Sequence, residues 1–460
     1  MTGQKESIHF IAIGGIGMSA LARILLSMGY RVSGSDVKTS YLVEELRKQG
    51  ADILIGHDAA NVPEDCTEII YSTAIAADNP ELLKGREMGI PITHRGDLLA
   101  RLFNGNRGLA VAGAHGKTTT SGMLGQILHK VDLRPNIVIG GILPLIGSNA
   151  LKDDSDIWVV EADESDRSFL KLAPYLTVVT NIEPEHMEHY EDDPEVLKKA
   201  FSNFCNSSQE IIVCLDNKMV NEIMPSFTGT CHTYGLDHKA VDLTARDIVS
   251  NALATTSKVY YKGEFVGELN LSVPGRHNVS NALGAIYAAY IIGVPFRSSM
   301  AALMDFSGTG RRFDVLFEDA DRHIMVVDDY AHHPTEVAAT IAAAKTCGYD
   351  RVLAVFQPHR YTRVKELYKE FGAVFGEADV VIMAEIYSAW EERLPEITSA
   401  LIVDELKSHG VDPVYCHTDG DILAYLQENV GDGDLVLMMG AGDIYKTTEK
   451  FCEYLREEKV

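Results

Sequence analysis

The chain has 460 residues, which at about 150 residues per domain predicts roughly three domains. Apolar residues make up 46% and charged residues 23%, ordinary values for globular proteins that exclude wholesale disorder and fibrous repeats. The 41 basic and 66 acidic residues give a formal net charge of −25, which repels nucleic-acid phosphate and disfavours nucleic-acid binding as the main activity. An anionic substrate would therefore need a local basic pocket.

The sequence carries no signal for a membrane or an oxidising compartment. Its most apolar run, Ala282 to Phe296, is shorter than the about 20 residues of a spanning helix, and residues 1–9 do not resemble a signal peptide. The seven cysteines are dispersed without a C-x-x-C pair, which predicts reduced thiols and no zinc cluster. We therefore expect a cytoplasmic protein with neither a membrane nor a nucleic-acid partner.

Short β-branched runs alternate with longer helical patterns, which predicts an α/β fold with mostly parallel sheets. Linkers rich in turn residues near 104–107 and 307–312 divide the chain into 1–104, 105–311 and 312–460. Residues 218–272 are expected to form an antiparallel edge on the middle domain. The predicted buried strands are 8–13, 31–35, 68–71, 109–112, 157–160, 177–180, 211–214, 324–327, 351–356, 380–384 and 435–438.

The first predicted strand leads into a glycine-rich turn, Gly14-Gly15-Ile16-Gly17-Met18-Ser19-Ala20. From Gly15 it reads G-x-G-x-x-A, in which glycines let the backbone approach a phosphate at a helix N-terminus. The next strand ends at Asp36, where a carboxylate commonly meets a ribose hydroxyl. This pattern fits NAD, FAD or another pyrophosphate-linked nucleotide, or a tight turn without a ligand.

A second motif, Gly113-Ala114-His115-Gly116-Lys117-Thr118-Thr119-Thr120, follows the strand at 109–112. Its Gly-Lys-Thr core is typical of a loop that binds a nucleoside triphosphate. Backbone N–H groups would surround the phosphates, Lys117 would reach the β and γ oxygens, and the Thr118 hydroxyl would meet Mg²⁺. Val111 stands where the standard spacing has a glycine, so only the strand-before and helix-after context supports the prediction.

Acidic loops follow two further strands and should emerge beside the phosphate loop. Glu161 ends one strand and is a candidate Mg²⁺ ligand. His186, in the loop after the other strand, is either a ligand for an ion softer than Mg²⁺ or a solvated histidine. Asp163, Glu164 and Asp166 either join this site or cap the next helix.

Seven motifs in order, spanning roughly residues 8–445, resemble those of the Mur ligases, the ATP-dependent amide-bond ligases that build the peptide of peptidoglycan. The motifs are Gly-Gly-Ile-Gly-Met-Ser-Ala, Gly-Ala-His-Gly-Lys-Thr-Thr-Thr, Glu-Ala-Asp-Glu-Ser-Asp, Asn-Ile-Glu-Pro-Glu-His-Met, Pro-Gly-Arg-His-Asn, Asp-Asp-Tyr-Ala-His-His-Pro-Thr-Glu and Phe-Gln-Pro-His-Arg-Tyr-Thr-Arg. The resemblance implies a Rossmann-like first domain for a UDP-sugar, a central P-loop ATPase domain and a Rossmann-like C-terminal domain for the amino acid. The first turn is then expected to bind the diphosphate of UDP instead of NAD. The family's phosphate loop also lacks the outer glycine.

The resemblance also implies roles for individual residues. Those expected at the UDP-sugar are Gly15, Ile16, Gly17, Met18, Ser19, Asp36, Ser72 and His94. Those expected at ATP are Gly113, Ala114, His115, Gly116, Lys117, Thr118, Thr119, His277, Asn278, Asn281, Arg312, Asp328 and Asp329. Thr118, Glu161 and His186 would bind Mg²⁺ or Mn²⁺, and Lys117, His332, Arg360 and Arg363 would act in catalysis. Tyr330 and His333 would line the site, although His332 and His333 alternatively cap the helix expected near Thr335.

The implied activity is ligation of L-alanine to the carboxylate of UDP-N-acetylmuramate through an acyl phosphate, with ATP as the phosphoryl donor, by a monomer or homodimer. A recycling ligase that adds a whole tripeptide to the same UDP-sugar shares nearly all these motifs. An NAD-dependent oxidoreductase is a third hypothesis, which the Gly-Lys-Thr loop opposes. A non-catalytic nucleotide-binding scaffold is a fourth, which intact Lys117, Glu161 and His186 oppose.

Overall fold

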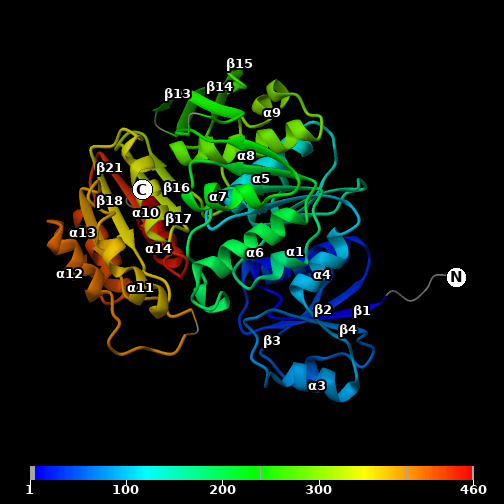
Figure 1. The fold of residues 1–460 in the computed structure, drawn as a ribbon. Coiled ribbons are helices and arrows are strands. Elements are labelled where there is room, and N and C mark those ends of the chain that lie inside the picture. The colour runs from blue at the N-terminus through cyan, green and yellow to red at the C-terminus, as the bar shows by residue number, and fades with distance from the viewer. Residues whose placement is uncertain (1–5, 239, 252, 390, 458–460) are drawn as a thin grey trace. The chain divides into compact units, whose positions relative to one another are not determined.

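The computed structural model describes residues 6–238, 240–251, 253–389 and 391–457, which form two compact units and three β-sheets (Figure 1). The first unit comprises the chain up to Arg246 together with Lys258–Leu269 and Ser280–Met304. The second comprises Asp247–Ser257, Asn270–Val279 and the chain from Asp305 onward. Within the described ranges, no helix has the length and apolar character needed to cross a membrane. All seven cysteines are free thiols, and only Cys231 is exposed.

The first sheet has five parallel strands in the order β3-β2-β1-β4-β5. Alternate residues of β1 face opposite sides, so Ile8 and Phe10 pack with α1, α2 and α4 whereas Ile11 packs with α3. Helices on both faces leave the carboxyl ends of the strands open for loops. The elements are β1 (Ser7–Ile11), α1 (Ile16–Ser27), β2 (Arg31–Asp36), α2 (Tyr41–Lys48), β3 (Asp52–Ile55), η1 (Ala59–Asn61), β4 (Glu68–Tyr71), α3 (Pro80–Met88), β5 (Ile92–His94) and α4 (Arg95–Phe103).

A buried carboxylate ties α3 to this sheet. Glu81, at the start of α3, has no exposed surface and is surrounded by hydrogen-bond donors. The donors to its carboxylate are His9 Nε2 (2.9 Å), Ser35 Oγ (2.7 Å), His57 Nδ1 (3.1 Å), Asn61 Nδ2 (3.1 Å) and the backbone N–H of Asp58 (3.3 Å). Burial by itself raises the pKa of Glu81, but the hydrogen bonds from His9, Ser35 and Asn61 outweigh it and bring the pKa below its ordinary value.

We expect Glu81→Gln to lower the stability of the protein, because an amide NH₂ cannot accept hydrogen bonds and would face donors of which two, His9 and Ser35, are fully buried. Breaking a buried charged network in this way costs about 3–5 kcal/mol. Thermal or urea unfolding measures the loss. The matched control is Glu87→Gln on the same helix, since Glu87 is exposed and pairs with Lys84 across the surface, at 3.2 Å. A Glu81→Gln protein as stable as the control would contradict this role.

The second sheet has ten strands in the order β15-β14-β13-β12-β11-β10-β6-β9-β7-β8. The pairs from β13 to β7 are parallel, and the β7–β8 pair is antiparallel. Helices α6 and α7 pack on one face with the apolar side chains of β6, β9, β10 and β11, and Figure 1 shows α5 and α8 on the other side. The strands are β6 (Arg107–Ala112), β7 (Asn136–Leu143), β8 (Ser148–Leu151), β9 (Ile157–Glu161), β10 (Leu176–Val179), β11 (Glu210–Cys214), β12 (Thr230–Tyr234), β13 (Leu243–Asn251), β14 (Ala254–Tyr261) and β15 (Glu264–Leu271). The helices are α5 (Lys117–Lys130), η2 (Pro144–Ile146), η3 (Ser168–Lys171), η4 (Met187–His189), α6 (Pro194–Asn206), α7 (Lys218–Ile223), η5 (Met224–Ser226), α8 (Arg276–Ile291) and α9 (Phe296–Ala302).

Residues 218–272 differ in part from the antiparallel edge expected there. The segment opens with a helix, α7, because the Asn217 side chain accepts a hydrogen bond from the backbone N–H of Val220 at 3.1 Å and so caps it. The strand that follows, β12, pairs parallel to β11, with Cys231 opposite Ile211. The prediction of a strand-rich segment holds from β12 onward, whereas the all-antiparallel arrangement was wrong.

The third sheet has the order β16-β17-β21-β18-β19-β20, and only the β16–β17 pair is antiparallel. Helices α10, α11 and α12 pack on one face, and α13 and α14 pack on the other. The elements are β16 (Asp314–Asp319), β17 (Ile324–Asp329), α10 (Pro334–Lys345), β18 (Arg351–Phe356), α11 (Tyr361–Gly372), β19 (Val380–Met383), α12 (Ala400–Ser408), β20 (Val414–Tyr415), α13 (Asp419–Asn429), β21 (Asp434–Met439) and α14 (Tyr445–Glu457). All the predicted buried strands are present within two residues at either end, and the α/β class with mostly parallel sheets is confirmed.

Candidate active site

The glycine-rich turn between β1 and α1 is shaped by Asp36 at the end of β2. Asp36 Oδ2 accepts the backbone N–H of Gly14 at 2.8 Å, and Oδ1 accepts that of Lys38 at 3.3 Å. A Cβ atom at Gly14 would lie 2.8 Å from the same Oδ2, so this carboxylate requires glycine at that position. Asp36 therefore fixes the turn with both oxygens, in addition to any contact with a ligand.

Other predicted residues of this turn divide into exposed and buried ones. Ile16 is 39% exposed, whereas Met18 and Ser19 are buried and pack within the unit. Ser19 Oγ donates to the Ile16 carbonyl and lies 3.0 Å from Asn149 Nδ2, which comes from β8. The side chains of Met18 and Ser19 are therefore not available to a ligand, and the backbone N–H of Ser19 already donates to the Gly15 carbonyl at 2.8 Å. His94 Nδ1 caps α4 by accepting the N–H of Gly96 at 3.1 Å.

The phosphate loop adopts left-handed backbone conformations that explain its glycines. Gly116 has φ of 79° and Gly113 has φ of 140°. A Cβ at Gly113 would lie 2.1 Å from Thr180 Oγ1, and one at Gly116 would lie 2.4 Å from Asn281 Oδ1. Val111 is buried within β6, one residue before the strand ends, so no turn exists at the position where the standard pattern has its outer glycine. Asn281, predicted from sequence as an ATP contact, thus lies against the loop.

The loop is held in place by side chains from the end of β10. Asn181 Oδ1 accepts the N–H of His115 at 2.8 Å, and Asn181 Nδ2 donates to the carbonyl of the same residue at 2.9 Å. Thr180 Oγ1 donates to that carbonyl as well, at 2.6 Å. The shape of the loop is therefore set by the protein itself.

Lys117 begins α5, and its side chain is largely buried among acceptors. Its Nζ donates to the carbonyls of Gly113 and Ala114 and, at 2.8 Å, to Glu164 Oε1. Burial opposes the charged lysine, but the carboxylates of Glu164 and Glu161 outweigh it and raise the pKa of Lys117. Burial likewise raises the pKa of Glu164, to about 7, against the opposing charge of Lys117. A nucleotide phosphate would compete with Glu164 for the lysine ammonium.

Side chains at the carboxyl ends of β9 and β10 offer ligands for a cation near the loop. Glu161, at the end of β9, accepts the N–H of Gly140 at 2.7 Å. His186 forms a group with Glu164 and Glu185, in which one ligand atom from each residue lies within 4.8 Å of the others. Glu164 Oε2 is buried and has no hydrogen-bond partner in the part of the chain that the structure describes.

The donor set of this group fits a divalent cation, since carboxylate oxygens suit Mg²⁺ and an imidazole extends the choice to Mn²⁺. Glu161 is not part of the group. Sequence reasoning missed Glu185 and left Glu164 open between ligand and cap. Their position in two loops at the carboxyl ends of β9 and β10 was the signal that could have identified them.

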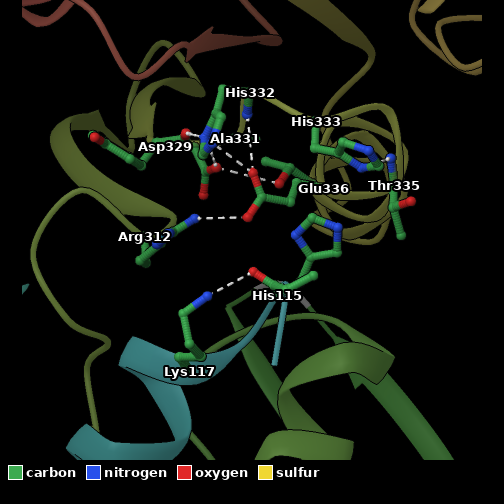
Figure 2. A network of polar contacts seen from close by, with 12 residues as sticks. His115, Lys117, Arg312, Asp329, Ala331, His332, His333, Thr335 and Glu336 are labelled. Atoms are coloured by element: carbon green, nitrogen blue, oxygen red, sulfur yellow. Dashed lines mark hydrogen bonds and ion pairs between the residues drawn. The ribbon is translucent and has the colours of Figure 1, made fainter. Parts of the chain in front are cut away.

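In the second unit, Glu336 on α10 is the centre of a polar network (Figure 2). Its Oε1 lies 3.4 Å from Arg312 Nη1, and its Oε2 accepts the backbone N–H of His332 at 3.1 Å. Arg312 also lies over the ring of Tyr330, 5.1 Å from its centroid. Glu336 therefore positions two residues predicted from sequence, Arg312 and His332, although the sequence did not single it out.

The two adjacent histidines have different roles. His333 caps α10, because its Nδ1 accepts the N–H of Thr335 at 3.4 Å, so the capping alternative applies to this residue. His332 Nδ1 lies 2.8 Å from the carbonyl oxygen of Tyr330, which can only accept. The proton of a neutral His332 ring is thus on Nδ1, and Nε2 carries the lone pair that a general base needs.

Asp328 and Asp329 end β17 and are both buried. Asp328 Oδ2 accepts Arg311 Nε at 2.8 Å. Asp329 accepts the backbone N–H groups of Phe313 and Ala331, each at 2.7 Å, the second of which is drawn in Figure 2. Burial raises the pKa of Asp329 to about 6, with Arg312 opposing. Asp329 therefore has a structural role beside the contact with ATP expected from sequence.

The raised pKa of Asp329 predicts a pH-dependent stability. The folded protein binds this proton more tightly than the unfolded chain, whose aspartate has a pKa of about 4, so the free energy of unfolding falls as pH rises from about 4 to about 6 and is then level. A shift of about two units corresponds to about 2–3 kcal/mol. Asp329→Asn should be less stable throughout, since its NH₂ faces a backbone donor, and should lose this slope in urea titrations. Exposed Asp432→Asn is the control; an unchanged slope in Asp329→Asn would contradict the assignment.

The arginines expected to act in catalysis both lie at the start of α11. Arg360 donates from Nε to Glu391 Oε1 at 2.6 Å, and Glu391 also accepts from the side chain of Thr362 at 2.6 Å. Arg363 is buried, with Nη1 3.4 Å from His359 Nδ1. Farther back in the chain, Asn278 is anchored at the start of α8 by donating to the Pro274 carbonyl at 2.7 Å. Glu391 is a partner that sequence reasoning did not provide.

Three family models match successive parts of the chain. They are described as Mur ligase family, catalytic domain (residues 7–107), Mur ligase middle domain (111–289) and Mur ligase, glutamate ligase domain (311–442). The chain therefore belongs to the Mur ligase family, as its motifs predicted.

Several relatives carry the name UDP-N-acetylmuramate–L-alanine ligase. One from Carboxydothermus hydrogenoformans is 45% identical over 441 residues, covering 95% of this chain and 94% of the relative. One from Pelotomaculum thermopropionicum is 44% identical and covers 99% of both chains. Among solved structures, the UDP-N-acetylmuramate-alanine ligase of Thermotoga maritima superposes with a TM-score of 0.87 at 29% identity, over 98% of this chain and 99% of that one. A murein peptide ligase from Psychrobacter arcticus shares the fold, with a TM-score of 0.74 at 23% identity and 98% coverage of both chains.

Proposed function

We propose that this chain is an ATP-dependent ligase that joins L-alanine to the carboxylate of UDP-N-acetylmuramate in peptidoglycan precursor synthesis. The observation that carries the proposal is the phosphate loop, with Lys117 at the start of α5 beside loops that bear Glu161, Glu164 and His186. Relatives named for this reaction align with nearly the whole chain, which supports the choice of substrates.

The proposed chemistry has two steps. A carboxylate oxygen of the muramoyl group attacks the γ-phosphorus of ATP, ADP leaves, and an acyl phosphate forms. The deprotonated amine of L-alanine then attacks the acyl carbon, and the tetrahedral intermediate expels phosphate. Lys117 offsets charge on the β and γ oxygens, and the loop held by Asn181 orients them.

Mg²⁺ or Mn²⁺ held by Thr118, Glu161 and the Glu164–Glu185–His186 group would supply further neutralisation of phosphate charge. Arg360 and Arg363 would bind carboxylate or phosphate, for which a planar guanidinium is suited. His332 would accept the amine proton through Nε2. The Gly15–Gly17 turn, with Ser72 and His94, would bind the UDP-sugar.

The division into 1–104 for the UDP-sugar, 105–311 for ATP and 312–460 for the amino acid is part of the proposal. So are a cytoplasmic location and a monomeric or homodimeric state. In 1–104 and in 105–311, loops and helices follow the carboxyl ends of the parallel strands. Ligands of open α/β sheets bind at these ends, which supports the first two assignments.

Phosphate release from ATP with UDP-N-acetylmuramate, in the presence of single amino acids and of the tripeptide in turn, tests the function. We expect L-alanine to be best and glycine and L-serine to be poor, since one methyl group is worth about 10–200-fold in discrimination. Release driven by the tripeptide and not by L-alanine would identify the recycling ligase instead. Tight NAD binding without UDP-sugar binding would indicate an oxidoreductase.

A further inference from the structure

Arg95 occupies a position between the glycine-rich turn and the acidic loop of the ATP site, all within the first unit. It follows β5 directly and is the first residue of α4. Its side chain is 21% exposed, and its charge is matched by two carboxylates of the loop after β9. None of the sequence motifs pointed to it.

The two terminal nitrogens of its guanidinium group differ in their hydrogen bonds. Nη2 donates to Asp163 Oδ2 at 2.6 Å and to Asp166 Oδ2 at 2.8 Å. Nη1 donates to no acceptor within the described ranges and lies 3.4 Å from where a Cβ of Gly17 would be. A donor edge without an acceptor therefore faces the turn that is proposed to bind a diphosphate.

The loop that Arg95 holds also carries the groups of the nucleotide site. Asp166 is further bound by Thr73 Oγ1 at 3.0 Å, from the loop after β4. Asp163 lies directly before Glu164, which holds Lys117, and two residues after Glu161.

The start of α4 is also closely packed on the segment that follows the loop, so a shift of one is transmitted to the other. A Cβ at Gly96 would lie 2.6 Å from the Cβ of Ser168 in η3, and Lys171 Nζ pairs with Asp97 at 2.7 Å. Asn104, at the end of α4, donates to the Lys171 carbonyl at 3.0 Å. Arg95 thus holds the start of the acidic loop through Asp163, and the rest of α4 holds the segment that follows the loop.

We propose that Arg95 is a positioning residue that couples the two substrate sites: its Nη1 edge meets a phosphate bound at the Gly15–Gly17 turn while its Nη2 edge fixes Asp163 and Asp166 beside the ATP site. The inference rests on the proposed function, which places the UDP diphosphate at that turn. A ligand on either side orders the same guanidinium and loop, so the second ligand binds to groups already in position. The two ligands therefore favour each other's binding, and by linkage the effect is reciprocal.

Calorimetric titration of the full-length protein with UDP-N-acetylmuramate, with and without a saturating non-hydrolysable ATP analogue and Mg²⁺, measures this coupling. In the parent we expect the analogue to tighten UDP-sugar binding about 5–150-fold, the usual range for coupled sites. In Arg95→Lys the ratio should fall to about 1, because one ammonium cannot span two edges as a guanidinium does. Asp166→Asn should also reduce the ratio, by loosening the loop without altering the glycine-rich turn.

Arg101→Lys is the matched control, since Arg101 lies on the same helix and makes a bidentate pair with Glu68, at 2.9 and 2.7 Å, away from both loops. It should keep the parent's coupling, and thermal unfolding of all variants verifies their fold. A ratio of 1 in the parent, or a parent-like ratio in both Arg95→Lys and Asp166→Asn, would overturn the inference alone. Failure of the parent to bind any UDP-N-acetylmuramate would overturn the proposed function and the inference with it.

Discussion

Lys117→Ala is expected to abolish ATP turnover while the protein stays folded. The ammonium of Lys117 is the cation at the start of α5, and its carbonyl and carboxylate partners mark the place where phosphate oxygens would be bound. Loss of one preorganised donor to developing charge costs about 10²–10³-fold in turnover, and here the donor also carries a full charge. Phosphate release in the presence of both other substrates measures the effect.

The control for this variant lies on the same helix. Lys130 is the last residue of α5 and is exposed, so Lys130→Ala should turn over at the parent's rate. Circular dichroism and thermal unfolding should show both variants folded. Near-normal turnover by a folded Lys117→Ala protein would refute the phosphate-loop assignment and with it the proposed ATPase site.

Glu161→Ala should produce the second large loss, in the dependence on Mg²⁺ or Mn²⁺. Glu161 ends β9 beside the loop, and its carboxylate also fixes the backbone of Gly140, so the alanine variant loses both a candidate ligand and a support. We expect apparent metal affinity to fall about 10–100-fold or more, by analogy with the loss of groups that orient metal ligands. His186→Ala should act in the same direction. Metal titrations of turnover, at fixed ATP, provide the measurement.

Glu210→Gln is a suitable comparison, because Glu210 begins β11 and so lies at the amino end of the parallel strands, whereas Glu161 lies at the carboxyl end, and because Glu210 pairs with His232 at 2.7 Å. Its metal titration should overlay that of the parent. If Glu161→Ala and His186→Ala also overlay it, neither residue serves a metal ion in turnover.

The sequence predicted the strands well because parallel strands buried on both faces are continuous apolar runs, as at Arg351–Phe356. It failed at Lys218–Ile223, where a single cap residue, Asn217, starts a short helix in a segment otherwise rich in strands. The phosphate loop was predictable despite Val111, since strand, glycine and helix followed one another in the right order.

Partners between distant segments were not predictable from one sequence. Glu336 binds Arg312 across 24 positions and Arg95 binds Asp163 across 68, and neither pair has a local spacing that reveals it. The same holds for Glu164, whose hydrogen bond with Lys117 spans 47 positions. Motifs indicated the residue types that touch substrates, whereas the residues that position them emerged only from the packed structure.

The side chain of Asn181 has a kinetic consequence. It pairs with both the N–H and the carbonyl of His115, as a neighbouring strand pairs with the backbone of a β-strand. The loop therefore requires no nucleotide to become ordered. Little conformational entropy is then lost at this point when ATP arrives. Association at the loop should accordingly approach the limit set by diffusion and electrostatic repulsion from an acidic surface, and should quicken as added salt screens that repulsion.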